Sequence, residues 1–93
     1  MKSIFSEEGK CFMCGSGSWL EVHHVFGGGN RRKSEKYGLT AYLCHYCHNE
    51  PPYGVHHNQE TALRLKREAQ KAAMGFYNWG IDDFIRIFGR NYL

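Results

Sequence analysis

Four cysteines form two pairs, each with a spacing that suits a metal ion. Two residues separate Cys11 from Cys14, two separate Cys44 from Cys47, and 29 residues lie between the pairs. A two-residue gap lets both thiolates of a pair reach one ion, and two such pairs complete a closed tetrahedral site. The sequence therefore predicts a structural zinc site that uses all four cysteines.

A redox role is the alternative for these cysteines, because paired thiols at this spacing also occur in dithiol oxidoreductases. The pattern of strands and helices around them is not of the thioredoxin kind, which favours zinc. The N-terminal residues lack the apolar stretch of a secretory signal, so we expect a cytoplasmic chain whose thiols stay reduced. No run of about 18 apolar residues occurs, so no membrane span is predicted.

Six histidines are the second group of side chains with chemical potential: His23, His24, His45, His48, His56 and His57. A buried imidazole needs a polar partner, and a neutral imidazole is a common ligand of divalent metals. His48 directly follows Cys47, so zinc at the cysteines would fix its backbone against the strand that carries His23 and His24. These positions favour a shared centre that includes His56. Solvent-facing or turn-capping histidines are the plain alternative.

Two predicted strands and a short helix position these side chains. Residues 19–25 and 39–44 are rich in β-formers and are predicted to pair as a hairpin. Residues 26–38 hold four glycines and several basic side chains, and we predict a loop there. A short helical turn is predicted to begin near Cys44 and to stop at the two prolines that follow.

The C-terminal part of the chain has helical periodicity. Apolar residues recur at spacings of three and four from about residue 58, and again over residues 81–88. The chain has 93 residues, of which 42% are hydrophobic, so we predict one domain whose small core needs a staple. Its fold class is α+β, with a zinc-stapled core over about residues 11–58 and a helical packing segment over about residues 59–93.

Several segments resemble a known family. Residues 21–25 (EVHHV) and 43–48 (LCHYCH) resemble the signature of the HNH, or ββα-metal (His-Me finger), endonucleases. Residues 54–58 (GVHHN) and 87–93 (IFGRNYL) are similar to segments of small HNH proteins encoded by phages and prophages. The resemblance implies a ββα-metal core with zinc knuckles, followed by two helices. It also implies a metal-dependent endonuclease that hydrolyses phosphodiester bonds in DNA.

The same resemblance implies a role for each histidine of the signature. His23 would bind a catalytic divalent metal, and His24 would be the general base that activates water. His48 would be a second ligand of that metal. His56 would be the third, with His57 as the alternative. Imidazole ligands suit Zn²⁺, Ni²⁺ or Mn²⁺ better than Mg²⁺, which prefers oxygen.

One position departs from the family pattern. The middle asparagine of the signature usually lies shortly before the second pair of cysteines, where this chain has residues 39–41 (LTA). Thr40 and Asn30 are the candidates to replace it and to orient His24 by a hydrogen bond. The departure is also the best support for a different function. A zinc-ribbon module would bind nucleic acid or protein without cutting.

Basic side chains are concentrated in two segments, and the formal net charge is +3. The predicted DNA contacts in the first segment are Asn30, Arg31, Arg32, Lys33 and Lys36. A second group lies on the helix over residues 64–71, where a solvated charged face is an equal alternative. Such contacts with phosphates give affinity that depends on salt and little on sequence. The phage resemblance adds recombination or packaging proteins as partners, and a purely structural zinc protein of phage assembly as a third interpretation.

Overall fold

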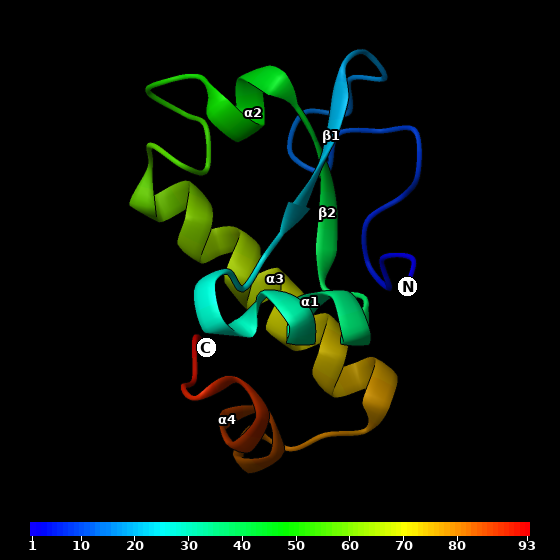
Figure 1. Ribbon diagram of the computed structural model, residues 1–93, viewed down its shortest axis with the longest axis vertical. Coiled ribbons are helices and arrows are strands. Elements are labelled where there is room, and N and C mark those ends of the chain that lie inside the picture. The colour runs from blue at the N-terminus through cyan, green and yellow to red at the C-terminus, as the bar shows by residue number, and fades with distance from the viewer.

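A computed structural model describes all 93 residues. Two antiparallel strands run along the middle of the molecule, and helices flank them (Figure 1). The elements in chain order are β1 (Leu20–His24), the 3₁₀ turn η1 (Gly28–Asn30), α1 (Arg31–Tyr37), β2 (Thr40–Cys44), α2 (His45–Asn49), α3 (Gln59–Tyr77) and α4 (Ile81–Phe88). No helix combines the length and the apolar character that a membrane span requires.

The sheet has the strands that the sequence predicts, to within one or two residues at each end. Leu20 pairs with Cys44 at one end of the sheet, and His24 pairs with Thr40 at the other. This register places Cys44 at the end of β2, where α2 begins without an intervening loop. The predicted α+β class is therefore confirmed, and so are the short helix after β2 and the two C-terminal helices.

The segment between the strands is not the loop that the sequence predicts. Residues 31–37 form α1, because the glycines of this segment gather before the helix and directly after it. Gly38 ends α1 with a left-handed φ of 72°. A Cβ at Gly38 would lie 2.7 Å from the carbonyl oxygen of Lys2, so the N-terminal segment packs against this turn. The loop was predicted from the number of glycines, and glycines that cap a helix cannot be distinguished from loop glycines by number alone.

Gly38→Ala is expected to lower the free energy of unfolding by about 2 kcal/mol or more, because a left-handed alanine costs about 1–2 kcal/mol before any clash. Gly75→Ala is the matched control. Gly75 lies inside α3, and a Cβ added there would have no neighbour within 4 Å, so the change should stabilise by about 0.5–1 kcal/mol. Urea unfolding of both variants measures this. Equal stability of Gly38→Ala and wild type would contradict the close approach.

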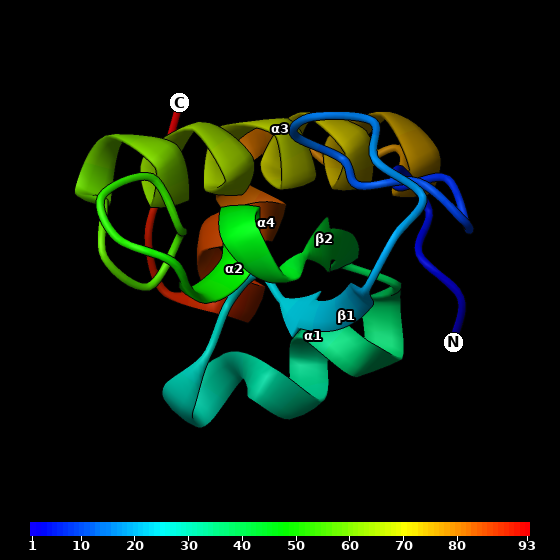
Figure 2. The same cartoon turned by 90° about the horizontal axis from the view of Figure 1, so that it is seen from above.

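The sheet lies between α3 on one side and α1 on the other (Figure 2). Phe26, which follows β1, joins the sheet to α4 by packing on Phe84 and Phe88 with ring centroids 5.5 and 4.8 Å away. The core consists of buried side chains from β2, α3, α4 and the residues next to the strands, among them Leu39, Leu43, Leu65, Ala69, Ala73 and Phe84. The core is small, because only 20 of 93 residues are buried.

Candidate metal centres

The four cysteines come together at one end of the sheet. Cys11 and Cys14 lie in the segment before β1, Cys44 ends β2, and Cys47 lies in α2. The four sulfur atoms are all within 4.8 Å of one another, and the Sγ atoms of Cys14 and Cys44 are 3.7 Å apart. Sulfurs around a tetrahedral zinc ion, at about 2.3 Å each, lie about 3.8 Å from one another. The cysteines are free thiols arranged to hold a metal ion, as the spacing predicts.

The protonation of these thiols shows why a cation suits them. Burial acts to raise the pKa of Cys11, but hydrogen bonds from the backbone of Cys44, Cys14 and Met13 outweigh it and lower the value to about 7. The pKa of Cys47 is raised, first by burial and then by the neighbouring thiols. The Cys47 thiol therefore loses its proton more readily when a positive charge lies beside it, and a zinc ion would supply that charge.

A second cluster contains three of the predicted ligands. The ring nitrogens of His23, His48 and His56 all lie within 4.8 Å of one another. The Nε2 atoms of His48 and His56 are 2.9 Å apart, close to the roughly 3.0 Å expected for two nitrogens at right angles around an ion about 2.1 Å from each. A single hydrogen bond would give the same separation, so this distance alone does not indicate a metal site. The convergence of a third imidazole, from His23, is what makes the group a candidate ligand set. His57 does not belong to it.

His23 is held in its neutral form. Burial lowers its pKa to about 3, with smaller contributions from His48, His56, His24 and Lys66. The pKa of His56 is lowered too, first by burial. A neutral imidazole keeps a lone pair for a metal ion at pH 7. The site therefore offers its nitrogens without first having to release protons from His23.

The same shift gives a pH prediction for the folded chain. The unfolded chain takes up a proton at His23 near its ordinary pKa of 6.5, whereas the folded chain does so only near 3. Protonation between these values favours the unfolded state, so stability should decrease as pH falls from about 6.5, by at most about 1.4 kcal/mol per pH unit. Urea unfolding at pH 7, 6 and 5 should show a shallower decrease for His23→Gln. Parallel curves for the two proteins would contradict the burial of a neutral His23.

Glu21 supports this cluster from outside. Its Oε1 accepts a 2.7 Å hydrogen bond from Nδ1 of His48 and a 3.0 Å bond from Nδ2 of Asn49, and its Oε2 lies 3.2 Å from Nδ1 of His45. The proton of His48 is thereby fixed on Nδ1, and its Nε2 is free to face the other imidazoles. Sequence reasoning missed Glu21. The available signal was its alternation with His23, which puts both on one face of β1.

Glu21→Gln is expected to weaken metal binding at the histidine cluster by about 10–100-fold, because partners of this kind orient the ring and raise its basicity. The zinc content of the cysteine cluster should not change. Glu50→Gln is the control, since Glu50 contacts only the far side of His45, at Nε2. Competition with a metal-sensitive dye measures the affinity. An unchanged affinity in Glu21→Gln would show that His48 needs no partner.

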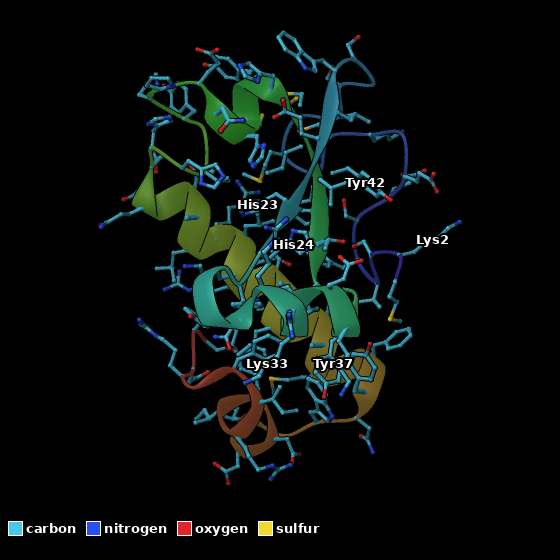
Figure 3. The ribbon with its side chains drawn as sticks, in the orientation of Figure 1. Lys2, His23, His24, Lys33, Tyr37 and Tyr42 are labelled. Atoms are coloured by element: carbon cyan, nitrogen blue, oxygen red, sulfur yellow. The ribbon has the colours of Figure 1, made fainter.

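His24 makes a different contact from the one the sequence predicts. His24 lies next to α1 (Figure 3). Its Nε2 is 2.9 Å from Oε2 of Glu35, a residue of that helix. Thr40 is buried and pairs with His24 through the sheet, but its side chain makes no hydrogen bond to the ring. The Asn30 amide donates instead to the carbonyl of Phe88. The side chain that orients the His24 ring is therefore Glu35. The prediction of a loop over residues 26–38 gave no reason to expect this contact.

The contact with Glu35 sets the tautomer of His24. The pKa of Glu35 is lowered, first by its hydrogen bond with His24 and then by the N-terminal amine, so the carboxylate is ionised at pH 7. It accepts the Nε2 proton, and Nδ1 keeps its lone pair. A carboxylate in this position also stabilises the imidazolium that forms when the ring takes a proton. His24 is thus an imidazole paired with a carboxylate.

Both histidine groups open into one cavity of about 460 Å³. Its lining includes His23, His24, His48, His56, Arg31 and Lys66, with no carboxylate among the lining residues. Of the predicted DNA contacts only Arg31 lines it. Lys33 lies between α1 and α4 (Figure 3). Its ammonium donates to the carbonyl of Ile87 at 2.6 Å and Asn30 donates to the carbonyl of Phe88, so both residues attach α1 to α4. Arg32 and Lys36 are exposed outside the cavity.

No protein-family model, curated protein or solved structure matches the chain. The functional interpretation therefore depends on the residues themselves. They form two separate clusters with metal-ligand chemistry, one of sulfurs and one of imidazoles. Beside the second cluster His24 lines the same cavity and pairs with Glu35, which is not a lining residue, and the charged residues of the lining are basic.

Proposed function

We propose that the chain is a metal-dependent DNA endonuclease of the HNH kind. Zinc at the four cysteines would hold the scaffold, and His23, His48 and His56 would hold one catalytic divalent ion. The observation that carries the proposal is the convergence of these imidazoles in one basic cavity beside the His24–Glu35 pair. A ligand set that is open on the side of the cavity differs from the closed sulfur site, and open positions are what catalysis needs.

The backbone of α2 and of the turn that follows it connects the two proposed metal sites. His48 follows Cys47 directly in α2, so zinc bound at Cys47 fixes the backbone of a histidine ligand. The next turn is tied back to α2, because the amide of Val55 donates to the carbonyl of Cys47 and that of His56 to the carbonyl of His48. Loss of the sulfur site would therefore release two of the three imidazoles.

In the proposed reaction His24 acts on water. Its Nδ1 takes a proton from a water molecule, whose oxygen attacks the phosphorus, and the bond from phosphorus to the 3′-oxygen breaks. Glu35 balances the charge on the ring while that proton is held. A divalent ion at the three histidines would supply open positions for phosphate oxygens and neutralise the departing oxygen. A solvent water protonates the departing 3′-oxygen, and His24 returns its proton to solvent. The products would then carry 3′-hydroxyl and 5′-phosphate ends, as the resemblance implies.

Plasmid nicking by the zinc-loaded protein tests this function. We expect nicking with Mn²⁺ or Ni²⁺, because imidazole ligands favour these ions over Mg²⁺. A chelator mild enough to leave the cysteine site loaded should stop the reaction. Absence of nicking with all of Mn²⁺, Ni²⁺, Zn²⁺ and Mg²⁺ would contradict the endonuclease proposal.

A non-catalytic zinc-ribbon module is the second candidate. It is favoured by Thr40, which stands near the place of the signature asparagine and makes no hydrogen bond to His24. Such a module would bind nucleic acid or a protein through its basic surface and hold one ion per chain. Its binding of DNA would be the same after His24→Ala. Phage recombination or packaging proteins remain the partners that the resemblance proposes for either candidate.

A further inference from the structure

The basic lining of the cavity comes from both sides of the sheet. Arg31 belongs to α1 and Lys66 to α3, and these helices lie on opposite sides of the strands (Figure 2). The lysines and arginines that pair with carboxylates are others, namely Lys2, Lys10, Lys71 and Arg86. Arg31 and Lys66 therefore bring unbalanced positive charge to the cavity.

The charge continues from Lys66 onto the C-terminal residues. The Lys66 ammonium lies 5.5 Å from the centre of the Tyr92 ring, and the Arg90 guanidinium lies 4.8 Å from it. Arg67 adds a third cation, because its Nε donates to the carbonyl of Tyr92 at 3.1 Å. We call Lys66, Arg67 and Arg90 the Tyr92 cluster. None of the three forms a salt bridge with a carboxylate; the Tyr92 ring faces Lys66 and Arg90, and the Tyr92 carbonyl accepts from Arg67.

Tyr92 is fixed in place, which makes the cluster a built surface rather than a mobile tail. Its ring packs on Phe26, with centroids 5.3 Å apart. Its amide donates to the Gln70 side chain at 2.8 Å, and the Gln70 amide donates to Asn91 at 2.8 Å. Gln70 is fully buried, so these bonds are shielded from water. Phe26 lies two residues after His24, next to Val25 of the cavity lining, which couples the position of Tyr92 to the cavity.

We propose that the Tyr92 cluster binds the phosphodiester backbone of DNA, next to the phosphate that lies at the histidines. The proposal rests on the endonuclease function and extends it. A strand would pass from Arg31 across the cavity to Lys66 and Arg90, so that phosphates on both sides of the scissile one are held. Rigid cations without a carboxylate partner, placed beside an open cavity, are well suited to donate hydrogen bonds to phosphate oxygens.

Binding without cleavage tests the proposal. The zinc-loaded chain, with no second metal added, is titrated into a short labelled DNA duplex, and anisotropy gives the affinity at several salt concentrations. One phosphate contact contributes about 0.9 to the logarithmic salt slope, which corresponds to about eight-fold in affinity at 0.1 M salt. We expect Lys66→Gln and Arg90→Gln each to lose about that factor, and the loss to disappear towards 1 M salt.

Two controls separate charge from structure. Lys71→Gln removes a lysine of the same helix that pairs with Glu68, and should change the affinity less than two-fold. Lys66→Arg should restore wild-type binding. Zinc content and circular dichroism show whether each variant is folded. If Lys66→Gln does not fold, Arg90→Gln still tests the proposal, because Arg90 is exposed.

The outcomes distinguish this proposal from the endonuclease proposal. Wild-type affinity in folded Lys66→Gln and Arg90→Gln would overturn the Tyr92 cluster while leaving the nuclease function intact. Weakened binding in both variants, together with no nicking by wild type under any metal, would support the cluster and remove the nuclease. Absence of DNA binding by wild type at low salt would overturn both.

Discussion

Cys47→Ser is expected to abolish cooperative unfolding of the domain. Cys47 is buried, and it belongs to the cluster that ties the segment before β1, the end of β2 and α2 together. Zinc binding to such sites has an apparent free energy of about 10–16 kcal/mol. That is as large as the whole stability of about 5–15 kcal/mol that is typical of a domain. With only 20 of 93 residues buried, the remaining core cannot replace it.

Thermal unfolding followed by circular dichroism measures this effect. Chelation of zinc from the wild type should reproduce the behaviour of the variant. Met13→Leu is the control at the other cysteine pair of the same site, because it conserves volume at a position that is not a ligand and should cost less than about 1.5 kcal/mol. A Cys47→Ser protein that melts cooperatively near the wild-type temperature would show that zinc does not hold the fold.

His24→Ala is expected to reduce plasmid nicking by about 10²–10⁴-fold, the usual contribution of a general base. Both metal sites should stay loaded, because His24 is not among the three imidazoles that converge. The change therefore separates proton transfer from metal binding. Glu35→Gln should reduce nicking by a smaller factor, since the ring keeps its place but loses the charge that stabilises its protonated form.

His57→Ala is the matched control for this experiment. His57 neighbours a proposed ligand in sequence, yet it is exposed and lies outside the ligand group. We expect nicking within a few-fold of wild type from this variant. Nicking by His24→Ala at the wild-type rate would exclude His24 as the base, even with the metal requirement unchanged.

The parts of the site that are local in sequence could be predicted. Cysteine spacing alone identifies the sulfur cluster, because two-residue gaps fix the geometry of each pair wherever the pairs lie. His48 was predictable for the same reason, being the neighbour of Cys47. The high content of β-formers located both strands, and apolar periodicity located α3 and α4.

The parts that depend on tertiary packing could not be predicted. Glu35 reaches His24 only because residues 31–37 coil into a helix, and the glycines around that segment hid the helix. Glu21 reaches His48 across 27 positions of the chain. Lys33 looked like a phosphate contact but is bound to the carbonyl of Ile87, a use that only the docking of α4 reveals. Charge in a sequence does not tell which basic groups the fold leaves free.

Two metal centres in one chain are the central claim, and the number of bound ions tests it most directly. The zinc-loaded protein is dialysed against excess Mn²⁺ or Ni²⁺, and elemental analysis gives the ions per chain for wild type and His48→Ala. We predict one zinc plus one further ion in the wild type, and zinc alone in His48→Ala. A wild-type protein that retains zinc and takes up no second ion under these conditions would contradict the account.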